Sequence, residues 1–158
     1  MKKVFLFTIV ILSFTSCSSD DDGNSNSLVG HKWIYDQISD YVFSESDLEG
    51  IELLDYETLY NECGDSGKFD YFQMKANGVS IDAWYEGDMD CELLTTEGTW
   101  SQSGNMIIIE EDYGDGESVT YYYEILEQSN SSLKVKIKEV YVWDDNTFVS
   151  YSIVVFRK

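Results

Sequence analysis

Proline is absent from this chain of 158 residues, histidine occurs once, and 10 basic side chains stand against 30 acidic ones. The formal net charge of −20 repels nucleic acid and anionic membrane surfaces, which are themselves densely negative. The lone histidine, His31, leaves a zinc site or a Ser/His/Asp set poorly supported. The sequence therefore predicts no catalytic residues, no cofactor, no metal site and no nucleic-acid partner.

Two acidic runs, over residues 86–92 and 110–117, carry oxygen ligands that calcium accepts. Neither run matches the spacing of the twelve-residue calcium loop. Acidic loops without a bound ion are favoured over a calcium site, and the second possibility stays open.

Long apolar runs are also absent. Residues 4–12 are apolar apart from Thr8, which is too short for a span of about 20 helical residues. Lys2 and Lys3 precede this run, as in the basic region of a signal peptide, and small residues lead to Cys17. Ser13-Phe14-Thr15-Ser16-Cys17 resembles a lipobox, the site at which a cysteine is lipidated and the preceding bond is cut. Residues 1–16 are thus predicted to be a lipoprotein signal peptide and Cys17 the lipidated residue.

Residues 17–27 form a polar, low-complexity stretch that cannot bury a core, and we expect a flexible acidic tether there. Its acidic triplet, residues 20–22, resembles the export signal that carries some lipoproteins to the outer face of the outer membrane. The predicted location is therefore the outer membrane, with the lipid on Cys17 as anchor and the protein facing the cell surface. Residues 28–158 are expected to form one domain.

The two cysteines that remain, Cys63 and Cys91, would lie in an oxidising compartment, where pairing is the default. A disulfide is favoured. A metal or redox pair is the alternative, although no CxxC motif is present.

Aromatic residues make up 15% of the chain and include 12 tyrosines, a composition that favours strands. Eight segments show alternation or turn signals typical of antiparallel strands. They cover residues 32–39, 69–76, 79–85, 98–102, 106–111, 118–127, 133–143 and 147–157. Helical spacing over residues 44–61, with Ser46 as candidate N-cap, predicts one short helical insert. The expected fold is all-β, an eight-stranded antiparallel up-and-down barrel, with a two-sheet β-sandwich as the alternative.

Several short motifs occur in a recognisable order. They are Gly30-His31-Lys32-Trp33, Cys63 followed by the hairpin at Asn77-Gly78, Cys91 followed by Gly98-Thr99-Trp100 and Ser103-Gly104-Asn105, Leu133-Lys134-Val135, and the terminal Val155-Phe156-Arg157-Lys158. Together they resemble the small bacterial lipocalin-like domains over residues 28–158, with the segment near 44–61 as a departure expected to lie over one mouth of the barrel. The resemblance implies a lipocalin-like barrel, the pairing of the two cysteines, and a small apolar ligand held inside.

Aromatic side chains are the candidate site residues. Tyr85, Tyr121, Tyr123 and Tyr141 would give a cavity apolar walls with a few hydroxyl donors, and Trp33 and Trp100 are expected to plug the barrel. Small residues on the expected inward faces, Ala83, Ser150 and Ser152, leave space, whereas Tyr121, Tyr123 and Phe156 fill it. The expected function is binding of a small apolar or amphipathic ligand by a monomeric, non-enzymatic lipoprotein. A filled barrel with a structural or protein-interaction role is the alternative, and no protein partner is specified.

Overall fold

The computed structural model describes residues 28–158 except 61–62, 88–89, 115 and 145. Cys17 and the segments predicted as signal peptide and tether lie outside the described residues. Within those residues one antiparallel sheet has the strand order β2-β1-β3-β4-β5-β6-β7-β8-β9. The strands are β1 Lys32–Ile38, β2 Leu54–Asp55, β3 Tyr71–Met74, β4 Val79–Glu86, β5 Glu92–Ser103, β6 Met106–Gly114, β7 Glu117–Gln128, β8 Ser132–Trp143 and β9 Asn146–Arg157.

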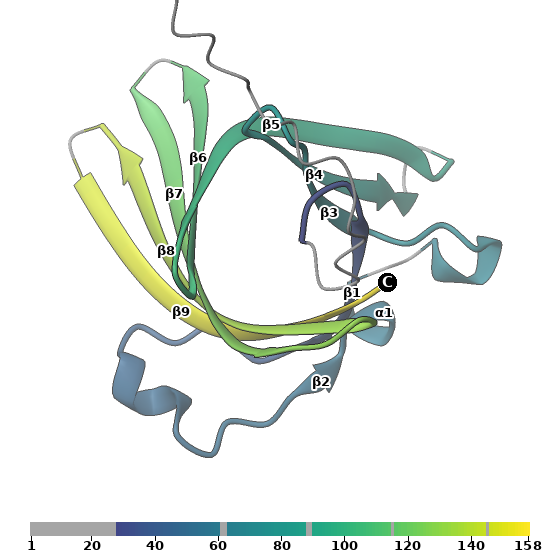
Figure 1. Ribbon diagram of the computed structural model, residues 1–158, viewed down its shortest axis with the longest axis horizontal. Helices are drawn as coiled ribbons and strands as arrows, with labels where there is room; N and C mark the ends of the chain where they lie inside the picture. Colours follow the sequence, from purple (N-terminus) through teal and green to yellow (C-terminus); the bar gives the residue numbers. More distant parts are fainter. Residues whose placement is uncertain (1–27, 61–62, 88–89, 115, 145) are drawn as a thin grey trace, which may run out of the picture.

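The sheet closes on itself because β1 pairs with both β3 and β9 (Figure 1). Strand β2, two residues long, pairs with the end of β1 and stands outside the ring of eight. The expected eight-stranded up-and-down barrel is confirmed, and the open sandwich is wrong because closure leaves no second sheet. Strand β5 begins at Glu92, well before the expected residue 98, so most of residues 86–97 belong to strands and not to a long connection.

Apolar inward positions fill one half of the barrel. The largest completely buried side chains come from five strands around the ring: Trp33, Phe72, Met74, Ile107, Ile109, Leu133, Val135, Val154 and Phe156. Burial of such side chains stabilises the fold by about 1.5–3 kcal/mol each, relative to exposure. The alternation expected over residues 133–138 is confirmed, because Leu133, Val135 and Ile137 are buried between partly exposed lysines.

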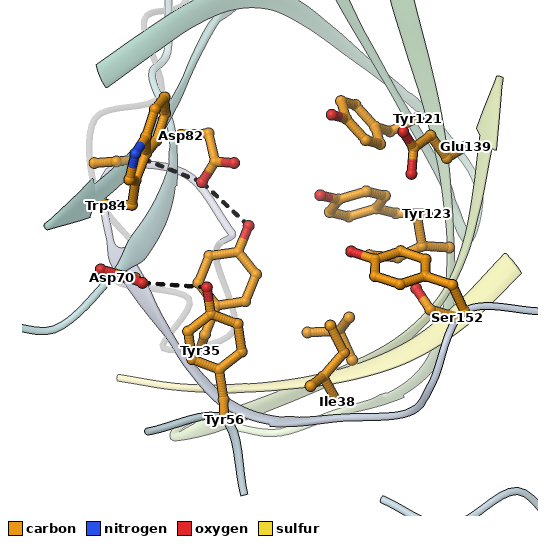
Figure 2. Close-up of a pocket in the computed structure, with 14 residues that line it drawn as sticks. Tyr35, Ile38, Tyr56, Asp70, Asp82, Trp84, Tyr121, Tyr123, Glu139 and Ser152 are labelled. Atoms are coloured by element: carbon orange, nitrogen blue, oxygen red, sulfur yellow. Dashed lines mark hydrogen bonds between the residues drawn. The ribbon is translucent and has the colours of Figure 1, made fainter. Parts of the chain in front are cut away.

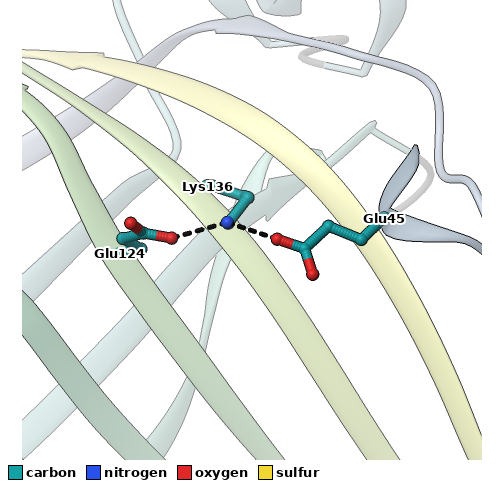
Figure 3. Close-up of polar contacts among 3 residues, drawn as sticks. All are labelled: Glu45, Glu124 and Lys136. Carbon is teal, nitrogen blue, oxygen red and sulfur yellow. Dashed lines mark hydrogen bonds and ion pairs between the residues drawn. The ribbon is translucent and has the colours of Figure 1, made fainter. Parts of the chain in front are cut away.

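The predicted helical insert is present but shorter than its periodicity implies. It consists of a 3₁₀ turn, Glu45–Leu48, and a single α-helical turn, α1, at Tyr56–Leu59. Ser46 is not an N-cap, because it lies inside the 3₁₀ turn; Asp55 caps α1 by accepting the amide of Thr58 at 2.8 Å. The insert is held to the outside of the barrel by Lys136, which contacts both Glu45 and Glu124 (Figure 3).

The disulfide between Cys63 and Cys91 is confirmed. It ties the segment after α1 to the start of β5. Lys68 reinforces the connection by donating to the carbonyl of Cys91 at 2.9 Å and lying 5.6 Å from the centre of the Tyr85 ring. Residues 63–70 are therefore fixed against the outside of the barrel beside β4.

Strand β4 faces the opposite way from the orientation that its apolar pattern suggests. Asp82 pairs with Phe72 and Ser80 pairs with Met74, so the even-numbered residues of β4 share the inner face with those buried side chains. The apolar odd-numbered set that contains Ala83 and Tyr85 therefore faces outward. Ala83 is nonetheless completely buried. Because both faces of β4 carry apolar residues, alternation alone gave the wrong face.

Candidate ligand-binding site

A cavity of about 270 Å³ lies inside the barrel, beyond the apolar half of the core. It is bounded by side chains of β1, β4, β7, β8 and β9, together with residues from the segments before β3 and after β1. Figure 2 shows Asp82, Asp70 and Trp84 on one wall and Tyr121, Tyr123 and Glu139 on the wall opposite. Pockets for drug-sized ligands have volumes of about 300–1,000 Å³, so this cavity lies just below that range and suits a smaller molecule.

Tyrosine is the dominant residue of the lining. Tyr121 and Tyr123 both point inward from β7, and Tyr122 between them points outward. The rings of Tyr121 and Tyr123 meet edge to face, with their centres 6.2 Å apart. Tyr35 of β1 stacks on Tyr56 of α1 at 4.8 Å. The insert thus contributes an aromatic side chain to the cavity wall, next to the barrel strands themselves.

Three carboxylates, Asp70, Asp82 and Glu139, also line the cavity, and each receives hydrogen bonds. Asp82 Oδ1 accepts the Tyr35 hydroxyl and the Ala83 amide, both at 3.1 Å. Asp70 accepts the Tyr56 hydroxyl at 3.1 Å and the Tyr85 amide at 2.8 Å. Glu139 Oε2 accepts the Ser150 hydroxyl at 3.3 Å. None of the ion pairs among the described residues involves these three groups.

Burial without a cationic partner disfavours the charged form of each carboxylate. Desolvation, assisted by the nearby negative charge of Glu111, raises the pKa of Asp82 to about 7. Burial also raises the pKa of Glu139, of Glu111 and of Asp70, although two hydrogen-bond donors oppose the shift at Asp70. Burial likewise raises the pKa of the Tyr121 and Tyr123 hydroxyls, which therefore stay protonated and able to donate.

The structure brings two of the four candidate tyrosines into the cavity, Tyr121 and Tyr123. Tyr85 is not a lining residue because the register of β4 turns it outward, under Lys68. Tyr141 occupies an inward position of β8 but lies beyond the cavity, where its hydroxyl donates to Glu117 at 2.6 Å. Of the small residues, Ser152 lines the cavity on an inward face, whereas Ala83 borders it from a position that faces outward.

The two candidate plug residues lie in the apolar half. Trp33 is completely buried, and its indole N–H donates to the carbonyl of Leu28 at 3.0 Å. Trp100 is half-buried against the core and donates to the carbonyl of Lys75 at 2.8 Å. Both indoles thus have hydrogen-bond partners, as buried tryptophans usually do.

The carboxylates of the site were missed from the sequence, although a signal for them exists. In two strands, and in β3 with the residue that precedes it, an inward apolar series ends in an acid two residues further along. Ile107 and Ile109 are followed by Glu111, Val135 and Ile137 by Glu139, and, running backward, Met74 and Phe72 by Asp70. These acids form an acidic layer above the apolar core, and their positions two residues beyond the apolar series are visible in the sequence.

Among residues 28–158, with the gaps given above, no three side chains of the metal-ligating types are grouped as a metal site. The same residues include no helix long and apolar enough to cross a membrane.

Comparison with known proteins gives one family and one structure. Residues 32–135 match the model of a protein family described as a lipocalin-like domain. Among solved structures, the bovine lipocalin allergen Bos d 2 is similar, with a TM-score of 0.40 and 16% identity over 80% of this chain and 70% of that chain. No curated protein matches the sequence.

Proposed function

This chain belongs to the lipocalin-like domain family, and we propose that its barrel binds a small amphipathic molecule as a non-enzymatic, lipid-anchored protein of the cell envelope. The observation that carries the proposal is the cavity of about 270 Å³ inside the barrel, with tyrosine rings and carboxylates on its walls. An eight-stranded barrel has room for side chains or for one small ligand. Here the inward residues leave that room, which favours the binding function over a filled, purely structural barrel.

Binding of the neutral fluorescent probe N-phenyl-1-naphthylamine tests the cavity. We expect saturable fluorescence enhancement that a cavity-filling substitution, Ser152→Leu, reduces at least about tenfold in affinity. Ser152 is 2% exposed and lines the cavity, so added carbon atoms occupy the space that the probe needs. Ile153→Leu, on the same strand and facing outward, is the matched control and should leave binding unchanged.

Thermal unfolding of both variants shows whether the barrel remains folded, since overpacking costs about 1–3 kcal/mol. No enhancement in the wild-type protein, or equal binding by a folded Ser152→Leu variant, would contradict the proposed cavity function.

The membrane anchor is proposed from residues 1–22 alone. The basic, apolar and small-residue segments before Cys17, with the acidic triplet after it, support lipidation and export to the outer face of the outer membrane. Substitution Cys17→Ala should move the protein from the membrane to the soluble fraction of a native host and remove the lipid mass from intact-protein spectra. If the variant still fractionates with membranes and neither form carries lipid, the anchor is wrong. Cleavage by added protease in intact cells tests the surface orientation.

A further inference from the structure

The walls of the cavity carry more negative charge than a purely apolar ligand needs. We propose that the cavity selects a small amphipathic amine, whose ammonium group binds between Asp82 and Glu139 while its apolar part lies on the tyrosine rings. The inference rests on the proposed ligand-binding function and names the chemical class of the ligand.

The first support is unused hydrogen-bonding capacity at two partly buried carboxyl groups. Both bonds to Asp82 reach Oδ1, and among the described residues none reaches Oδ2. Glu139 likewise accepts only at Oε2. Figure 2 shows the two carboxyl groups on opposite walls, both directed into the cavity. An ammonium group has three donors and no acceptor, which matches oxygens that can only accept when ionised.

The one buried side-chain polar atom without a partner among the described residues lies on the same inner face of β4, beside the cavity lining and not in it. Ser80 is 1% exposed, and its hydroxyl has no hydrogen-bond partner among the described residues. A Cβ placed on Gly98 would lie 2.9 Å from both Ser80 Oγ and Glu111 Cγ, so the hydroxyl is close to the acidic layer. Buried groups without partners are uncommon in folded proteins and point to a bound molecule or water.

The electrostatic environment favours a cation over a neutral or anionic ligand. The lining contains three carboxylates and no lysine, arginine or histidine. A cation would offset the repulsion that Glu111 and Asp70 exert on the Asp82 carboxylate, which raises the free energy of the empty site. The net charge of −20 also raises the local concentration of cations at the protein surface.

The aromatic walls favour an organic ammonium group over a bare metal ion. The faces of tyrosine rings attract cations within about 6 Å, and their hydrocarbon surface accommodates an apolar substituent. Tyr121 and Tyr123 lie beside Glu139, while Tyr35 and Tyr56 lie beside the two aspartates (Figure 2). A volume of about 270 Å³ exceeds the needs of a single ion and fits a small molecule of mixed character.

Calorimetry with three ligands of similar size tests the charge of the occupant: 2-phenylethylamine, 2-phenylethanol and phenylacetate. At pH 8 we expect the amine to bind at least about tenfold more tightly than the alcohol, and the acid not to bind. Asp82→Asn and Glu139→Gln should each lower the amine affinity about tenfold or more and leave the alcohol affinity unchanged. Glu97→Gln, an exposed carboxylate of β5, is the charge-matched control and should change neither.

Raising the pH from 5 to 8 provides an independent readout. The amine stays protonated throughout, whereas Asp82, with its pKa raised to about 7, gains its charge. Amine affinity should therefore rise with pH while alcohol affinity stays constant. The groups that face Asp82 come from every neighbouring element: Tyr35, Asp70, Glu111, Tyr121, Tyr123 and Glu139. The carboxyl groups among them can share in this titration, whereas burial keeps the tyrosine hydroxyls protonated across this range.

The outcomes separate the inference from the proposed function. If the alcohol and the neutral naphthyl probe bind as well as the amine, the cavity binds ligands but the selection of amines is wrong. If Glu97→Gln weakens amine binding as much as Asp82→Asn, the effect is one of net charge and the site is wrong. If no probe binds at all, the proposed function itself fails.

Discussion

Removal of the disulfide is expected to lower the free energy of unfolding by about 3–4 kcal/mol. Cys63 and Cys91 are 28 residues apart, and the loop-entropy relation for a closed loop of that size gives this magnitude. Cys63 is 1% exposed, so alanine is the substitution there, and serine suits the more accessible Cys91. The double variant Cys63→Ala/Cys91→Ser should show the loss as a lower midpoint in urea.

The reduced wild-type protein is the control for this variant and should unfold at nearly the same urea concentration. Hydrogen exchange should rise first in residues 63–70, which the bridge holds against the barrel, and least in β8 and β9, whose ladder is the longest. A loss below about 1 kcal/mol would mean that Lys68 and the packing of this segment hold it without the bridge.

The barrel could be predicted from the sequence because its C-terminal half obeys a simple rule. Over residues 133–138 of β8 the inward residues are apolar and the outward residues are lysines, and a change of register by one residue would reverse every one of them. The hairpin at Asn77-Gly78 was equally readable. Gly78 has a φ of 78°, a left-handed conformation that glycine adopts easily. In this conformation its amide donates to the carbonyl of Lys75 and closes the turn.

The same rule failed for β4 for a physical reason. Ala83 is buried on the outer face while the partly buried Asp82 lies on the inner one, so polarity does not report which face looks inward. Only the pairing of Asp82 with Phe72 settles the orientation, and pairing is a tertiary property. Tyr85 was assigned to the cavity, and Asp82 left out of it, through this single error.

The contribution of the insert could not have been derived from periodicity either. Tyr56 reaches the cavity because Asp55 starts a new helical turn there and because the Tyr56 hydroxyl donates to Asp70. The helical spacing over residues 44–61 suggested one continuous element, which would have placed these side chains differently. Local hydrogen bonds to aspartate thus decided a part of the site that the apolar pattern does not encode.

Replacement of Asp82 by asparagine is expected to stabilise the ligand-free protein at pH 8, by about 2–4 kcal/mol. The carboxyl has an ordinary pKa of 3.8, and in the folded barrel burial and the charge of Glu111 raise the pKa to about 7. A difference of about three pH units corresponds to about 4 kcal/mol at about 1.4 kcal/mol for each unit. The carbonyl of asparagine can still accept the Tyr35 hydroxyl and the Ala83 amide, so the local hydrogen bonds persist.

The sign of the pH dependence follows from proton binding. Well below pH 3.8 the carboxyl of Asp82 is protonated in both the folded and the unfolded chain. At pH 4 the unfolded chain has only begun to lose this proton, and the variant should still match the wild type within about 1 kcal/mol. Between pH 4 and pH 7 the unfolded chain has lost this proton and the folded chain retains it, so the contribution of Asp82 to stability falls as pH rises. Above pH 7 the full penalty is present, and the advantage of asparagine is largest there.

Urea unfolding of both proteins at pH 4, 6 and 8 measures this effect, with Glu97→Gln expected to stay within about 0.5 kcal/mol of wild type throughout. A variant that is less stable than wild type at pH 8 would mean that the carboxylate is stabilised by its neighbours more than burial penalises it. If asparagine raises stability and abolishes amine binding together, Asp82 has an energetic cost in the empty barrel that only an occupant offsets. Functional sites commonly carry such a cost, and here it would lie on one inward residue of β4.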